Sequence, residues 1–104
     1  MAQIIFGGMD NREIVGVFPK AARRKFPDVR VVKVDSIDTL ADALRPNEGN
    51  VVFHKFDNEE VLATLGLVGI TATPHSGPIA VVHYDAASGK EYVRAVYAAI
   101  ESFR

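Results

Sequence analysis

The sequence predicts a compact single-domain α/β sandwich over residues 1–104, built on a four-stranded, mostly parallel sheet. Four short apolar runs carry this prediction, at residues 4–6, 29–34, 51–56 and 79–84. The run at residues 4–6 is apolar on both faces, which is typical of a parallel strand buried between helices. A stretch with helical spacing follows each run. This alternation of strand and helix indicates right-handed crossovers within one sheet.

The helices of the first half begin at recognisable capping signals. Asp10 with Glu13 three positions later predicts a capping box, in which each side chain bonds the backbone N–H of the other residue. Pro19 removes a backbone donor within the helical stretch that follows, so we expect a kink or two short helices there. Ser36 is the predicted cap of the next helix, over residues 37–44.

The second half repeats this pattern. Asp57 and Glu60 predict a second capping box, before a helix that ends near Gly69. Residues 71–78 form the longest polar loop, which is either a binding loop or an ordinary connection. The last helix has a broad apolar face that serves either core packing alone or also a dimer surface. Its members are Tyr92, Val93, Val96, Tyr97, Ile100 and Phe103.

The order and spacing of the elements resemble the IIB components of the phosphotransferase system over the whole chain. The similarity is strongest at Ile4-Ile5-Phe6-Gly7-Gly8-Met9 and at Ser88-Gly89-Lys90 before the last helix. It implies a flavodoxin-like βα repeat with helices on both faces of the sheet. That family accepts phosphate on a cysteine at the end of the first strand. The chain has no cysteine, so phosphocysteine transfer is excluded.

The first third is also similar to thioredoxin, which gives a thioredoxin-like alternative for the fold. The shared features are a strand ending at Phe6, a helix containing Pro19, and the run of residues 26–35. On this alternative, residues 51–56 and 61–67 would form an antiparallel hairpin. Dithiol redox chemistry is excluded, again because there is no cysteine.

Composition narrows the remaining function classes. Twelve basic and thirteen acidic residues give a net charge of −1. Because nucleic-acid-binding proteins normally carry an excess of basic residues, we expect no nucleic-acid partner. The basic cluster at residues 20–25 is either a solvated helix face or a patch for a partner or phosphate. No apolar stretch approaches the ~20 residues that span a bilayer, and the start of the chain does not resemble a secretory signal. We expect a cytoplasmic protein with no membrane association and no cofactor.

The carboxyl edge of the sheet is the expected place for a site, because ligands of open α/β sheets bind beyond the carboxyl ends of the strands. Gly7 and Gly8 precede a helix, where backbone N–H groups can hold phosphate. Together with Arg12 and Lys90 they are the candidate ligand-binding residues. The other interpretation of the two glycines is a tight turn followed by a helix cap.

Two histidines are the candidate catalytic groups at this edge. His54 and His83 lie late in the third and fourth predicted strands, so their imidazoles approach each other if these strands are neighbours. With Asp85 nearby in sequence, one of them could act as a general base. The alternative is that both are packed or surface histidines. His75 is predicted at the opposite end of the sheet, and we assign no metal ligand.

These observations leave two functions open. We prefer a non-enzymatic binding or regulatory module that acts through a protein partner, or as a homodimer through the C-terminal helix, because the sequence completes no catalytic constellation and no phosphate-loop signature. The alternative is a small enzyme, or a ligand- or phosphate-binding domain, with its site at the carboxyl edge of the sheet.

Overall fold

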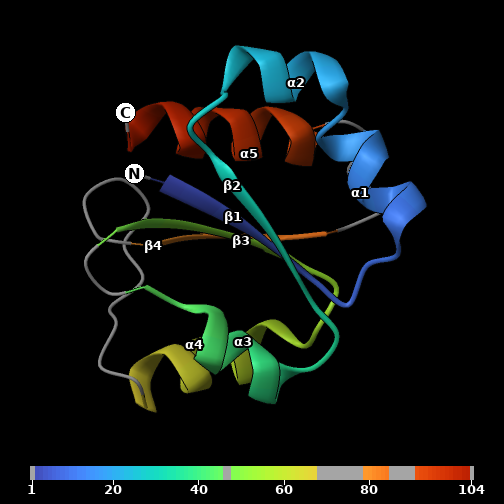
Figure 1. Cartoon of the computed structure of the whole chain (residues 1–104). Helices are drawn as coiled ribbons and strands as arrows, with labels where there is room; N and C mark the ends of the chain where they lie inside the picture. The colour runs from blue at the N-terminus through green and yellow to red at the C-terminus, as the bar shows by residue number, and fades with distance from the viewer. Residues whose placement is uncertain (1, 46–47, 68–78, 85–90, 104) are drawn as a thin grey trace.

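The sheet consists of four parallel strands in the order β2-β1-β3-β4 (Figure 1). The computed structural model describes residues 2–45, 48–67, 79–84 and 91–103. The predicted α/β class is confirmed, and the strand order is consistent with a flavodoxin-like arrangement. The strands are β1 (Ala2–Gly7), β2 (Arg30–Val34), β3 (Gly49–His54) and β4 (Ile79–His83).

Helices cover both faces of this sheet (Figure 1). One face carries α1 (Asn11–Val17), α2 (Lys20–Lys25) and α5 (Glu91–Ser102), and the other carries α3 (Ile37–Ala43) and α4 (Asn58–Leu67). All six residues of β1 are buried. A strand with helices on both sides has no solvent-facing side, which explains the uninterrupted apolar residues 4–6 at its centre.

The helix starts follow the predicted caps. The Asp10 side chain accepts from the Glu13 N–H at 2.8 Å, and the Glu13 side chain accepts from the Asp10 N–H at 3.1 Å. The expected interruption at Pro19 separates α1 from α2. Ser36 caps α3. Asp57 caps α4 by accepting from two backbone N–H groups of its first turn.

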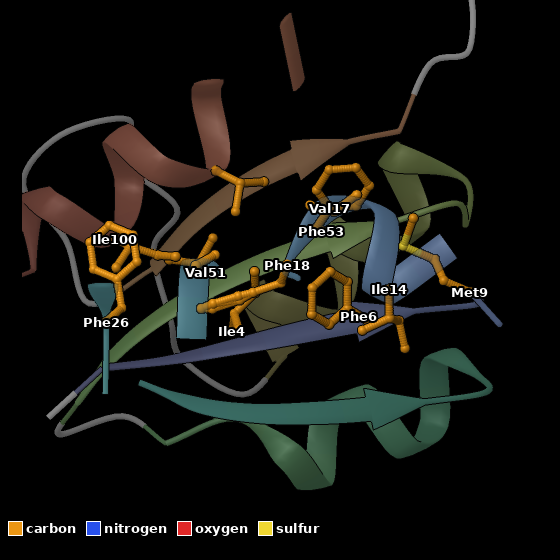
Figure 2. Packing of buried hydrophobic residues seen from close by; sticks show 12 residues of the cluster. Ile4, Phe6, Met9, Ile14, Val17, Phe18, Phe26, Val51, Phe53 and Ile100 are labelled. Atoms are coloured by element: carbon orange, nitrogen blue, oxygen red, sulfur yellow. The ribbon is translucent and has the colours of Figure 1, made fainter. Parts of the chain in front are cut away.

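The core has two parts, one on each face of the sheet. The larger part lies beneath α1, α2 and α5 and includes Phe6, Phe18 and Phe53 (Figure 2). The smaller part lies beneath α3 and α4, around Ile5, Leu40 and Leu65. Alternate residues of each strand supply the two parts, as expected where successive side chains point to opposite faces.

A buried amide pair holds the amino edge of the sheet. Gln3 Nε2 donates to Asn50 Oδ1 at 2.7 Å and to the Ala43 carbonyl at 2.8 Å. Asn50 Oδ1 also accepts from the Arg45 N–H at 3.0 Å, and Asn50 Nδ2 donates to the carbonyls of Arg45 and Glu48 at 2.8 and 2.9 Å. This pair therefore ties Ala43, Arg45 and Glu48 to the amino edge of the sheet.

Two sequence-based expectations need correction. The thioredoxin-like alternative is wrong, because the segment expected to complete an antiparallel hairpin forms α4, and β3 pairs with β4 in parallel. The third strand also ends at His54 rather than at residue 56, so Lys55 and Phe56 belong to the connection that follows it. Gly69, His75, Asp85, Lys90 and the loop 71–78 lie outside the described residues. None of the described helices is both long and apolar enough to cross a membrane.

Candidate functional site

The two candidate histidines lie side by side at the carboxyl edge. The parallel register of β3 and β4 pairs His54 with His83, and their ring centres are 5.0 Å apart. The approach expected from their strand positions is therefore confirmed, whereas a catalytic role for them stays a prediction. His54 is 0% exposed and His83 is exposed. One imidazole is thus sealed beneath the edge and its neighbour opens to solvent.

Hydrogen bonds fix which nitrogen of each ring carries a proton. His54 Nε2 lies 3.3 Å from Asn58 Oδ1, and His83 Nε2 lies 3.1 Å from the Phe56 carbonyl oxygen. Both oxygens are acceptors, so each Nε2 donates, and in the neutral rings each Nδ1 carries a lone pair. His54 Nδ1 is buried and has no hydrogen-bond partner.

Burial controls the protonation of His54. Removal from water disfavours the charged imidazolium and lowers the pKa of His54 below its usual 6.5, and a charge on His83 would lower that pKa further. The hydrogen bond to Asn58 and an interaction with the Phe56 backbone oppose this lowering of the His54 pKa. At neutral pH His54 is therefore a neutral imidazole with a free, buried lone pair.

The Phe56 ring packs against Gly7 and Gly8, the candidate ligand-binding glycines. A Cβ placed on Gly7 would lie 2.6 Å from Phe56 Cε2, and one on Gly8, whose φ is +70°, would lie 3.0 Å from Phe56 Cε1. The Gly8 N–H donates to the Val34 carbonyl at 2.9 Å, and the Gly7 carbonyl accepts from the Lys55 N–H at 2.9 Å. These glycines therefore lie against an aromatic ring, and their role in binding a ligand stays a prediction.

Lys55 is a residue of this edge that sequence reasoning missed. Its Nζ donates to Glu13 Oε2 at 2.7 Å, and the same ammonium lies 5.3 Å from the centre of the Tyr84 ring. The hydrogen bond raises the pKa of Lys55 and lowers that of Glu13. Lys55 and Glu13 are 42 residues apart in the sequence, and no local sequence pattern predicts that they pair. Arg12, by contrast, is exposed on α1.

A second feature is the outward side of α5, beside the edge strand β4. The large apolar side chains Val96 and Ile100 are fully buried in the core, and the Tyr97 hydroxyl donates to the Val17 carbonyl at 2.9 Å. Small side chains of α5, namely Ala95, Ala98, Ala99 and Ser102, line a pocket of about 240 Å³ together with residues 80–82 of β4. The broad apolar face predicted for this helix therefore serves mainly the core.

Charged residues flank this small-residue surface. Arg94 and Glu101 are both exposed on α5, and neither forms an ion pair within the described part of the chain. They are seven residues apart, which places them two turns and about 10 Å apart on one side of the helix. Ala98 lies between them along the helix.

Comparison with known proteins gives no match to a family model, to a curated protein or to a solved structure.

Proposed function

We propose that this protein is a non-enzymatic binding module that acts as a homodimer through the outward side of α5. The observation that carries the proposal is the pattern Arg94, Ala98, Glu101 on an exposed helix surface. In a two-fold symmetric interface, residue i of one copy meets residue j of the other and the reverse contact also forms. An antiparallel pair of α5 helices crossing beside Ala98 would bring Arg94 of each copy against Glu101 of its partner.

The side chains at the proposed crossing support close approach. Ala95, Ala98 and Ser102 are small and exposed, and the separation of two packed helices, 8–10 Å, decreases with the size of the side chains between them. The pocket beside them offers apolar surface on residues 80–82 of β4. A second copy thus finds charge complementarity on one flank of the crossing and apolar surface on the other.

Residues at the carboxyl edge have structural roles that also favour a binding module over the enzyme alternative. Asp10 and Glu13 bond each other's backbone. Lys55 pairs with Glu13, and the space beside Gly7 is filled by Phe56. Asp10, Glu13, Lys55 and the space beside Gly7 are therefore engaged within the fold.

Charge reversal tests the proposed dimer. The dissociation constant is measured by sedimentation velocity for the natural protein, Arg94→Glu, Glu101→Arg and the double variant. Each single reversal places two like-charge pairs across the interface and should weaken the dimer by about tenfold, since exposed pairs contribute about 0.2–1 kcal/mol each. The double variant restores both pairs and should recover the natural affinity.

A matched control uses an equally exposed arginine on a different helix. Arg23→Glu on α2 changes the net charge by the same amount as Arg94→Glu, and it should leave the dimer unchanged. A protein that stays monomeric at every concentration contradicts the proposal. So does a double variant that associates more weakly than either single variant.

A further inference from the structure

We propose that His54 and His83 form a two-imidazole site for a divalent transition-metal ion such as Zn²⁺, at the carboxyl edge of the sheet. The two rings come from register-paired positions of neighbouring strands, so the backbone ladder holds them together without a flexible loop. Imidazole suits zinc, copper and nickel, whereas Mg²⁺ and Ca²⁺ prefer oxygen ligands. The ion class therefore follows from the ligand type.

The spacing of the rings fits one shared ion. Imidazole nitrogens bind Zn²⁺ at about 2.0–2.1 Å, which places each ring centre about 3 Å from the ion and two tetrahedrally bound rings about 5 Å apart. The ring centres of His54 and His83 are 5.0 Å apart. The separation of the two ring centres therefore matches that of two imidazoles on one shared ion.

The outer hydrogen bonds are those that metal-binding histidines use. A ligating histidine donates its other ring N–H to a carbonyl or carboxylate oxygen, which fixes the tautomer and orients the ring. Here His54 donates to the Asn58 side-chain oxygen and His83 donates to the Phe56 carbonyl. In both rings Nδ1 is left as the metal-binding atom.

A buried lone pair gives a second, independent observation. His54 is fully buried and its Nδ1 has no hydrogen-bond partner, although buried polar atoms are normally satisfied. His83 is exposed and gives an ion access from solvent. Within the described ranges no group of three or more His, Cys, Asp or Glu side chains could hold a metal, so the described residues supply two imidazole ligands to the proposed ion.

Calorimetric titration with Zn²⁺ tests the site in the 104-residue chain. The natural protein, stripped with a chelator, should bind one ion per chain. His83→Gln should weaken this binding by at least about tenfold, because loss of even an outer partner of a metal ligand typically costs 10–100-fold in affinity. His75→Gln removes the one histidine outside the proposed site and should leave the Zn²⁺ affinity unchanged.

A substitution at the buried His54 could disturb folding, so the test relies on the exposed His83 instead. His83 is exposed, so His83→Gln should preserve the circular dichroism spectrum. With Cu²⁺ in place of Zn²⁺, electron paramagnetic resonance should detect two imidazole nitrogens in the natural protein and one in His83→Gln. Unchanged Zn²⁺ affinity in a folded His83→Gln overturns the proposal, and so does a loss of binding in His75→Gln.

Discussion

The Phe56 ring occupies the space that a side chain at Gly7 would need, with Phe56 Cε2 only 2.6 Å from the position of a Gly7 Cβ. The same ring stacks on His54, with ring centres 6.2 Å apart and planes inclined by 19°. Residue 7 is therefore glycine because the aromatic ring of Phe56, from the connection after β3, lies against its backbone. This contact joins the ends of β1 and β3 above the buried histidine.

Gly7→Ala should destabilise the protein because the added methyl group meets the Phe56 ring. We expect a loss of about 1–3 kcal/mol in the free energy of unfolding, the usual cost of overpacking. Urea denaturation followed by circular dichroism measures it. A fully stable Gly7→Ala variant would show that the ring moves aside freely.

Gly16→Ala is the matched control for this substitution. Gly16 lies on α1, and a Cβ there would meet nothing within 4 Å. The change should stabilise the protein by up to about 1 kcal/mol, because alanine has the higher helix propensity. The two Gly→Ala changes are thus expected to have opposite signs.

Burial of His54 predicts a pH dependence of stability for the metal-free protein. The pKa of His54 is lowered in the folded state, so the unfolded chain binds this proton more readily. The resulting contribution to stability is complete above the unfolded pKa of about 6.5 and declines as pH falls below it toward the folded pKa.

Unfolding free energies measured from about pH 8 to pH 5 in the presence of a chelator check this dependence. His54→Gln should flatten the decline below about pH 6.5, since glutamine does not titrate. His75→Gln provides the comparison variant. An equally steep decline in the natural protein and His54→Gln would assign the pH dependence to other groups.

Asn50→Ala should be strongly destabilising because the amide connects four groups at the amino edge. Its side chain bonds Gln3, both backbone groups of Arg45 and the Glu48 carbonyl. Buried polar groups left unpaired cost about 1–3 kcal/mol each, so we expect a loss of at least about 3 kcal/mol.

Thermal and urea unfolding of Asn50→Ala measure this loss. Asn11→Ala, at an exposed position on α1, should change stability by less than about 0.5 kcal/mol. A similarly small effect at Asn50 would mean that water replaces the amide in this network.

Local patterns were sufficient to predict the elements of this fold. The caps at Asp10, Ser36 and Asp57 depend on residues within four positions, and each was found where the sequence placed it. The break at Pro19 follows from its missing N–H group. The predicted end of the third strand at residue 56 was wrong, because an apolar Phe56 extended the run although its ring packs beyond the strand.

The candidate site was only partly predictable. The approach of His54 and His83 followed from their equivalent strand positions, because parallel strands end at one edge. The Lys55–Glu13 pair did not follow from the sequence, since long side chains choose partners only after strand register and helix position are set. Burial of His54 depends in the same way on the packing around it, which the sequence does not display.

The sequence by itself determined the α/β class, the number of strands, the helix starts and the exclusion of thiol chemistry. The tertiary structure decided the strand order, the filling of the glycine turn by Phe56, and the use of most of the apolar face of α5 in the core. The physical reason is the distance along the chain over which each interaction acts. Hydrophobic period and capping act over a few residues, whereas packing joins side chains distant along the chain and exists only once the sheet has formed.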